Sequence, residues 1–156
     1  MKTSLFNDTI ENIRAAADII RDGGLVAFPT ETVYGLGADA LNSEAVGKVY
    51  AAKGRPSDNP MIVHIAETSE LAKLTDDISS DMRALMDAFW PGPMTMIVRR
   101  KDIVPDVTTG GLDTVGVRLP SSEVARALIR ESGCPIAAPS ANISGRPSPT
   151  TAEHVI

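Results

Sequence analysis

The sequence predicts an α/β fold in which helices surround a largely buried sheet, and two observations lead to this prediction. Segments with apolar residues at helical spacing alternate along the chain with short apolar runs of strand length. No internal repeat or low-complexity linker interrupts this alternation, and a chain of 156 residues with 43% hydrophobic and 22% charged residues suits one domain. The pattern alone leaves parallel and mixed strand orders open.

A helix followed by a strand is predicted at the start of the chain. Asp8 and Glu11 form a capping-box pattern, and apolar residues then recur at helical spacing until Gly23. The run LVAF at 25–28 is too short for a helix and is bounded by glycine and proline, which is typical of a buried strand. The loop PTETVYGLG at 29–37 leaves the end of this strand.

The next predicted elements are a helix, a strand and a short helix. Ser43 is expected to cap a helix that ends at Gly54, and MIVHI at 61–65 has the composition of a strand. SELAKL at 69–74 is expected to form a short helix. The segment KGRPSDNP connects the first helix of this group to the strand.

Another helix is predicted before the middle strand of the chain. Ser79 or Ser80 is expected to cap it, and one apolar face runs up to Phe89 before WPGPM breaks the helix. Phe89 and Trp90 are expected in the core. MTMIV at 94–98 is the third predicted strand.

A strand, a helix and a further strand complete the predicted alternation. They cover TVGVRL at 114–119, SEVARALIRES at 122–132 and PIAA at 135–138. The turn-rich loop PSANISGRPSPT at 139–150 follows.

The last segment, TAEHVI, carries a helix-start signal. Thr150 or Thr151 has the character of an N-cap, but only about one helical turn follows it. We therefore expect residues 1–156 to form a single domain that lacks its C-terminal end.

Composition excludes several functional classes. The net charge is −5, so any anion must be held by a few placed cations. No apolar run is long enough to span a membrane and MKTSLFNDT lacks a signal peptide's apolar stretch, which favours the cytoplasm. Cys134 has no cysteine partner, and His64 and His154 lie too far apart for zinc spacing. Cys134 is expected to be a buried apolar residue without a catalytic role.

Two nucleotide-binding motifs were tested and rejected. GLGADA, which starts at Gly35, fits the dinucleotide pattern G-x-G-x-x-A, but six residues separate it from the preceding strand. Gly47-Lys48 does not complete a P-loop, because Asn42 stands at the first glycine position and Val49 at the Ser/Thr position. A nucleotide would have to bind by other means.

Lys53 and Arg55 are candidates for holding a polyanion. Both could instead complement the C-terminal dipole of the preceding helix and face solvent. However, they lie two residues apart on a loop constrained by glycine and proline, where both side chains can point at one anion. Asn59 and Ser57 add neutral hydrogen-bonding groups nearby.

The loop PSANISGRPSPT is a second candidate. Its composition also suits an ordinary surface turn, but it follows an apolar strand directly, where α/β sheets usually place ligand loops. Ser140 and Asn142 could donate to phosphate oxygens or support a bound Mg²⁺, although no protein ligand for the metal is assigned.

Two polar residues interrupt apolar strands. Arg118 in VGVRL either faces solvent at the strand end or awaits a carboxylate, in the protein or on a ligand. His64 in MIVHI raises the same alternative, and a satisfied core or edge histidine is the commoner outcome.

Five segments taken together resemble the YrdC-like family of threonylcarbamoyl-AMP synthases. They are PTETVYGLG, KGRPSDNP with MIVHI, WPGPMT, VGVRLP and PSANISG, which occur in order from about Gly23 to Thr151. The family's K-x-R and S-x-N signatures are met by Lys53, Arg55, Ser140 and Asn142, which the resemblance implies as catalytic residues.

The resemblance implies a twisted, mixed α/β sheet with an open ligand cavity. It also implies a nucleotidyltransferase reaction that joins L-threonine, bicarbonate and ATP, with Mg²⁺, into threonylcarbamoyl-AMP and pyrophosphate. This product would then pass to the machinery that forms threonylcarbamoyladenosine in tRNA. A carbamate formed on the threonine amine would attack the α-phosphorus without a protein nucleophile.

The resemblance further implies two sets of binding residues. Threonine would be held by Thr32, His64 and Arg118, with the backbone of Ala138 nearby and Arg118 paired with the substrate carboxylate. ATP would be held by Lys53, Arg55, Asn59, Thr114, Ser140, Asn142 and Ser148.

Two other functions stay open alongside this one. The first is a module that binds double-stranded RNA or tRNA without catalysis, which the net negative charge disfavours. The second is a carbamoyl-transfer module related to hydrogenase maturation, which normally belongs to a much longer chain with Cys-x-x-Cys pairs.

Overall fold

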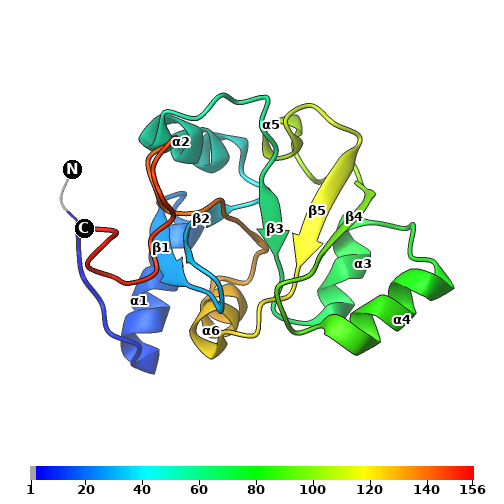
Figure 1. The fold of residues 1–156 in the computed structure, drawn as a ribbon, viewed down its shortest axis with the longest axis horizontal. Helices are drawn as coiled ribbons and strands as arrows, with labels where there is room; N and C mark the ends of the chain where they lie inside the picture. Colours follow the sequence, from blue (N-terminus) through cyan, green and yellow to red (C-terminus); the bar gives the residue numbers. More distant parts are fainter. Residues whose placement is uncertain (1–2) are drawn as a thin grey trace.

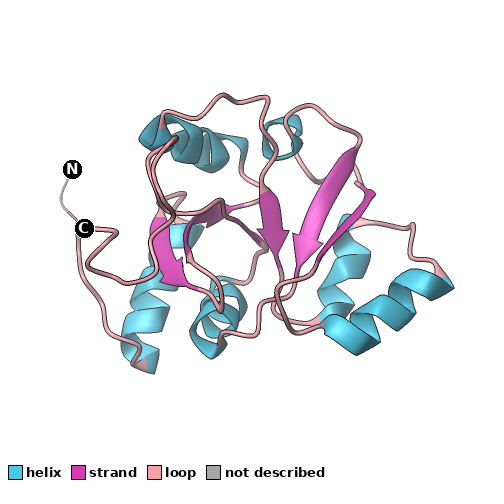
Figure 2. Ribbon diagram, viewed as in Figure 1, coloured by secondary structure: helices cyan, strands magenta, loops and turns pink. Residues whose placement is uncertain are grey.

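Helices and strands alternate along the chain as the apolar pattern predicts, in a computed structural model that describes residues 3–156 (Figures 1 and 2). The elements in chain order are α1 (Ile10–Arg21), β1 (Val26–Pro29), β2 (Tyr34–Asp39), α2 (Ser43–Lys53), β3 (Ile62–His64), the 3-10 turn η1 (Thr68–Glu70), α3 (Leu71–Leu74), α4 (Ser80–Phe89), β4 (Thr95–Arg99), α5 (Asp106–Thr109), β5 (Thr114–Arg118), α6 (Glu123–Ser132) and β6 (Ile136–Ala137).

The six strands form one mixed sheet in the order β1-β2-β6-β3-β5-β4. Strands β3 and β5 pair in parallel, whereas the other neighbours pair antiparallel. The predicted α/β class and mixed sheet are therefore confirmed. None of the helices within residues 3–156 is both long and apolar enough to span a membrane.

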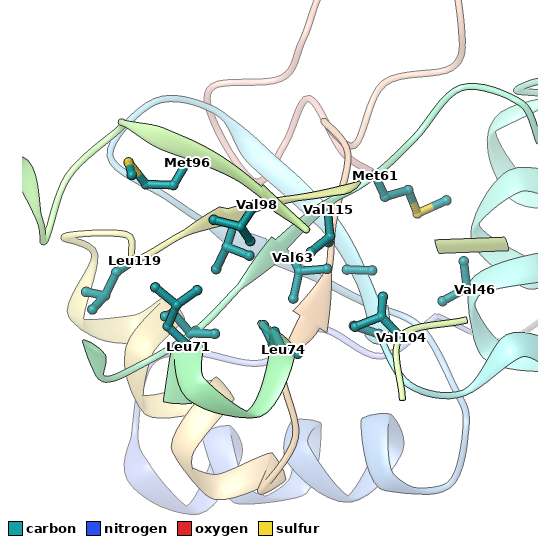
Figure 3. Close-up of a cluster of buried hydrophobic side chains, with 14 of the residues drawn as sticks. Val46, Met61, Val63, Leu71, Leu74, Met96, Val98, Val104, Val115 and Leu119 are labelled. Carbon is teal, nitrogen blue, oxygen red and sulfur yellow. The ribbon is translucent and has the colours of Figure 1, made fainter. Parts of the chain in front are cut away.

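Two hydrophobic clusters lie on opposite faces of the sheet. One joins strand residues such as Val63 and Val117 to apolar side chains of α2, α3 and α4 (Figure 3). The other joins α1 and α6, which pack against each other, to Phe28 and Ile136 of the sheet (Figure 1). Burial of these side chains is the main force that holds the helices on the sheet.

Strands β3, β5 and β4 present different chemistry on their two faces, because side chains alternate along a strand. Val63, Val115 and Val117 point into the first cluster and are at most 2% exposed. The residues between them point to the opposite side, which we call the site face. The pairing register places on it Ile62, His64, Thr114, Gly116 and Arg118, together with Thr95, Ile97 and Arg99.

The expectation of a loop over the whole of PTETVYGLG is wrong. Its second half is strand β2, which forms a hairpin with β1 through pairs such as Phe28 with Gly35. A Cβ atom on Gly37 would lie 2.6 Å from Ile136 Cγ2 and 2.7 Å from Phe28 Cε1. Gly37 is therefore required for packing between strand and core, which the sequence pattern did not reveal.

Several predicted helix boundaries need correction. No capping box forms at α1, where Thr9 is the N-cap and makes no side-chain cap hydrogen bond. Asn42, rather than Ser43, caps α2 by accepting hydrogen bonds from two backbone N–H groups. Ser79, one of the two predicted candidates, caps α4, and Ser122 caps α6.

Two further expectations about the chain are wrong. Phe89 is 56% exposed, because the face of α4 that carries it turns away from the core, whereas Trp90 is buried as expected. The helix predicted from Thr150 or Thr151 is a set of turns. The short helix α5 was not anticipated, because its four residues carry no apolar periodicity.

Candidate functional site

A cavity of about 260 Å³ opens beside the ends of β3 and β5 on the site face. This volume lies near the lower end of the range for small-molecule sites, roughly 300–1,000 Å³. Segments distant in sequence contribute to its wall. The lining residues are Thr30, Thr32, Val33, Gly35, Arg55, Pro60, Met61, Ile62, His64, Arg118, Ala138, Pro139 and Ser140.

Arg118 ends β5 and enters the cavity wall with its side chain 10% exposed. Its Nη2 donates to Glu31 Oε1 at 2.6 Å and to Thr32 Oγ1 at 3.3 Å. Its Nε is buried without a hydrogen-bond partner. Of the alternatives predicted for Arg118, solvent or a carboxylate partner, the structure shows a carboxylate of the protein. Glu31 accepts from Nη2, while Nε has no hydrogen-bond partner.

Glu31 belongs to the turn between β1 and β2, which the Thr30 side chain organises. Thr30 Oγ1 donates to Val33 O at 2.6 Å and accepts from Thr32 N at 3.2 Å. Ser122 ties this turn to the start of α6 by donating to Pro29 O at 3.0 Å. Burial disfavours the charge on Glu31, but hydrogen bonds from Arg118 and the backbone, with the charge of Arg118, lower its pKa.

His64 lies beside Arg118 and is 3% exposed. Burial first, and the charge of Arg118 second, lower its pKa from 6.5 to about 4, so the imidazole is neutral at physiological pH. The ring meets Phe28 edge to face at 6.1 Å between centroids. His64 therefore presents a neutral ring, with Nδ1 3.2 Å from the carbonyl oxygen of Ile62.

Arg55 contributes a second guanidinium to the cavity. Its Nη2 donates to Pro60 O at 2.9 Å, and its Nε is buried without a partner. Glycine at the C-cap of α2 adopts the left-handed conformation and turns the chain, so that Arg55 leaves the helix axis. Two guanidinium groups thus share one cavity wall, which suits anionic groups of a ligand.

Lys53 is 4% exposed and does not line the cavity. Its Nζ donates to the carbonyl oxygens of Ser140 and Asn142, and the Ser140 hydroxyl donates to Asn142 Oδ1. Burial, and then the charge of Arg55, lower the pKa of Lys53. The K-x-R and S-x-N segments therefore meet, with Lys53 holding the backbone of the serine loop.

Backbone pairing brings the first and last candidate segments together. Leu36 N donates to Pro139 O at 2.9 Å, and Ala141 N donates to Tyr34 O at 2.8 Å. Tyr34 N donates to Pro149 O at 2.8 Å. Ser140 and Ala138 consequently lie in the same cavity wall as the β1–β2 turn.

Six of the predicted site residues line the cavity, namely Thr32, Arg55, His64, Arg118, Ala138 and Ser140. The other five do not line it. Lys53 and Asn142 contact the serine loop, Asn59 and Ser148 are exposed, and Thr114 begins β5 on the same face as Arg118. The four-residue separation along β5 corresponds to roughly 13 Å between Thr114 and Arg118.

Glu31 is the functional candidate that sequence reasoning left unassigned. A signal existed, because an arginine in an apolar strand requires a carboxylate partner, and Glu31 is the acidic residue of the resembling segment. Eighty-seven residues separate the two, so the pairing depends on the fold.

Cys134 does not line the cavity. Cys134 is half-buried, and burial together with the nearby Asp39 raises its pKa to about 12, so the thiol stays protonated. Within residues 3–156 there is no group of three or more His, Cys, Asp or Glu side chains placed to hold a metal ion.

Fold and site together define a class of protein: a mixed α/β domain with a guanidinium-lined cavity where two parallel strands end. The chain belongs to the Sua5/YciO/YrdC family, described as "telomere recombination", whose model matches residues 18–156. The resemblance noted in the sequence is therefore confirmed.

Curated relatives carry one name. A threonylcarbamoyl-AMP synthase of Pyrococcus abyssi is 58% identical over 143 residues, which cover 92% of this chain and 42% of the relative. One of Bacillus subtilis is 58% identical over 144 residues, with the same two shares. The chain thus spans less than half the length of these relatives.

A solved structure supports the same assignment. The crystal structure of P. abyssi Sua5 complexed with L-threonine matches with a TM-score of 0.93 and 56% identity, over 94% of this chain and 43% of that one. The fold described above is therefore shared with a protein whose crystal structure contains L-threonine.

Proposed function

We propose that this chain carries the active site of a threonylcarbamoyl-AMP synthase, which forms threonylcarbamoyl-AMP and pyrophosphate from L-threonine, bicarbonate and ATP. The observation that carries the proposal is the cavity at Arg118, where a buried guanidinium donates to the Thr32 hydroxyl through Nη2 and keeps its Nε without a partner. The name of the relatives and the threonine complex of a similar structure support the choice of substrate.

At the threonine end, the ligand's carboxylate would pair with Arg118 through a charge-assisted hydrogen bond. The Thr32 hydroxyl would contact the polar groups of the amino acid, and the backbone of Ala138 would lie close to it. His64 would act as a neutral hydrogen-bonding group, because its pKa of about 4 excludes a cationic role at neutral pH.

At the nucleotide end, Arg55 would bind the phosphates of ATP. The Ser140 hydroxyl and the Asn142 amide would add neutral hydrogen bonds, and Asn59 and Ser148 would contact the outer part of the nucleotide. Thr114, which lies on the site face at the start of β5, would contact the part of the nucleotide farthest from Arg118.

The chemistry then follows from placement. The threonine amine condenses with bicarbonate to a carbamate and releases water. A carbamate oxygen then attacks the α-phosphorus, and the bond from this phosphorus to the bridging oxygen breaks, so that pyrophosphate leaves with that oxygen. Arg55 would stabilise the charge that develops on the leaving group. Mg²⁺ enters bound to ATP, since the described residues hold no carboxylate cluster for it. Lys53, with Ser140 and Asn142, completes the catalytic set by shaping the loop that faces the phosphates.

The product would supply the cytoplasmic machinery that transfers threonylcarbamoyl groups to tRNA. Catalysis is favoured over an RNA-binding module, because the buried guanidinium of Arg118 lines a cavity, where it suits a small anion and is withdrawn from a polynucleotide surface. The name of the close relatives favours it over a hydrogenase-maturation module.

The decisive experiment measures pyrophosphate release and ligand binding by the same protein. We expect pyrophosphate release to require both L-threonine and bicarbonate. We also expect the Arg118→Ala variant to bind threonine about 100-fold more weakly, since it loses a hydrogen bond to a charged group, while ATP affinity changes by less than about threefold.

Arg126→Ala is the matched control. Arg126 is also an arginine in ion pairs, with its side chain 19% exposed, but it contacts Glu67 and Glu123 and does not line the cavity. Pyrophosphate release that ignores threonine would exclude the proposed reaction. Equal loss of threonine and ATP affinity in Arg118→Ala would exclude the division of the cavity into two ends.

A further inference from the structure

The two guanidinium groups of the cavity have different partners. Arg118 donates to a carboxylate, Glu31 Oε1, at 2.6 Å. Arg55 donates to a neutral carbonyl, Pro60 O, at 2.9 Å. Among the ion pairs of residues 3–156, no carboxylate bonds to Arg55. The cavity therefore has one compensated cation and one uncompensated cation.

Glu31 is well placed to influence ligands without contacting them. Its side chain is 19% exposed and is not among the lining residues of the cavity, but its Oε1 lies 2.6 Å from Nη2 of Arg118, which does line it. The turn at Thr30 and the contact of Ser122 with Pro29 hold its backbone. Water screens such a half-buried charge less than it screens a charge on the surface.

Because Arg118 has a carboxylate partner and Arg55 does not, the two arginines should differ in their affinity for ligands of different net charge. A polyanion such as pyrophosphate gains from an uncompensated guanidinium but is repelled by a carboxylate close behind a compensated one. A zwitterionic amino acid has no net charge, so the same carboxylate barely opposes it. The unpartnered Nε of Arg118 shows that the guanidinium still has hydrogen-bonding capacity while it is bound to Glu31.

We propose that Glu31 is a specificity-determining residue, which reserves the Arg118 end of the cavity for a zwitterionic amino acid and confines phosphate anions to the Arg55 end. This inference rests on the proposed function, because it concerns how one cavity sorts two of its substrates. Without such sorting, ATP or the pyrophosphate product would occupy the amino-acid position and block the reaction.

The test compares binding of pyrophosphate and L-threonine to the wild-type chain and to Glu31→Gln by calorimetry. In the wild type, we expect pyrophosphate and threonine to bind without competing. In Glu31→Gln, we expect pyrophosphate to bind about tenfold more tightly, because one close negative charge is removed, and to compete with threonine. The double variant Arg55→Ala/Glu31→Gln should keep this pyrophosphate binding, whereas Arg55→Ala alone should lose it.

Two further variants separate charge from shape. Glu31→Asp keeps the negative charge, and we expect it to keep pyrophosphate and threonine independent. Glu131→Gln makes the same chemical change in the ion pair between Glu131 and Arg14, whose atoms lie 3.1 Å apart. It should change neither the pyrophosphate affinity nor the threonine affinity. Circular dichroism of each variant confirms that it is folded.

The proposal is overturned if Glu31→Gln binds pyrophosphate no more tightly than the wild type, or if Glu31→Asp loses sorting as fully as Glu31→Gln. A failure of the proposed function looks different, because then the wild type would not bind threonine at all. The pyrophosphate measurements decide the role of Glu31 in that case too, since they need no amino acid.

Discussion

The two faces of strands β3 and β5 carry different chemistry. On one face, Val63 and Val115 pack in a cluster with side chains of α2 and α3 (Figure 3), and Val117 is buried in the same cluster. On the other face, one residue further along the same strands, lie His64 and Arg118 of the cavity. Alternate residues of these two short strands therefore serve the core and the site in turn.

This contrast shows how polar groups can be kept in a small domain. The apolar face supplies stability through burial, whereas the site face keeps a buried ion pair and a neutral histidine, which cost desolvation energy. Because the two sets share a backbone, the core also fixes the position of the site. A shift of one residue in register would exchange the two faces.

The largest expected effect comes from placing a charge on the apolar face. Val117 is 0% exposed, and Val117→Asp would bury a carboxylate with no partner in this cluster. We expect the free energy of unfolding to fall by more than about 4 kcal/mol, which urea denaturation measures. The matched control is Ile97→Asp on the site face, where Ile97 is 69% exposed and we expect a change below about 1 kcal/mol. If both variants lost the same free energy of unfolding, the two faces would not differ in burial as described.

On the site face, His64 should make the free energy of unfolding depend on pH. The pKa of His64 falls from 6.5 to about 4 on folding, chiefly through burial. Between these values the unfolded chain binds a proton that the folded chain does not, so lowering the pH across this window destabilises the fold. The loss amounts to about 3 kcal/mol by pH 4, since each pKa unit corresponds to roughly 1.36 kcal/mol.

His64→Gln isolates this effect, because glutamine does not titrate. We expect the wild type to lose about 3 kcal/mol more than the variant when the pH falls from 6.5 to 4, measured by urea denaturation at each pH. The charged groups that face His64 are Arg118 and Glu31, and both are present in the two proteins, so the difference between the profiles isolates the imidazole. Parallel pH profiles for the two proteins would show that the imidazole is protonated equally in the folded and unfolded chains.

Local patterns predicted most of the fold because they reflect local physics. The apolar runs LVAF, MIVHI and TVGVRL are strands, and Ser79 and Ser122 cap the helices that follow them. Strand β2 was missed because its glycines lower strand propensity, and the reason for Gly37 is the close contact with Phe28 and Ile136. The contact with Ile136 joins residues 99 positions apart in the sequence, so no local pattern contains it.

The sequence indicated residues that the fold brings together, but it did not indicate their contacts. Thr32, His64 and Arg118, which the resemblance implies as threonine ligands, line one cavity, and their binding roles stay predictions. The sequence did not show that Glu31 neutralises Arg118, or that Lys53 points at carbonyl groups. Both facts depend on which side chains the fold leaves next to each other, and they change the roles that the motif suggests.

The smallest expected effect concerns Lys53, which links the end of α2 to the serine loop. Lys53→Met keeps most of the side chain's volume but removes the donor to the carbonyls of Ser140 and Asn142. We expect ATP affinity to fall by about tenfold, since two buried acceptors lose a partner and the loop loosens, while threonine affinity stays within about threefold. Calorimetry measures both affinities, and hydrogen exchange reports on the loop at residues 139–146.

The control for this variant is Lys101→Met, because Lys101 also donates to a backbone carbonyl, Ala72 O, at 2.7 Å, but lies outside the cavity. It should change neither affinity. If Lys53→Met weakened ATP binding without faster hydrogen exchange in the serine loop, Lys53 would act on the phosphates directly. A loss of threonine affinity as large as that of ATP would instead mean that the loop supports both ends of the cavity, and that the site face works as one rigid unit.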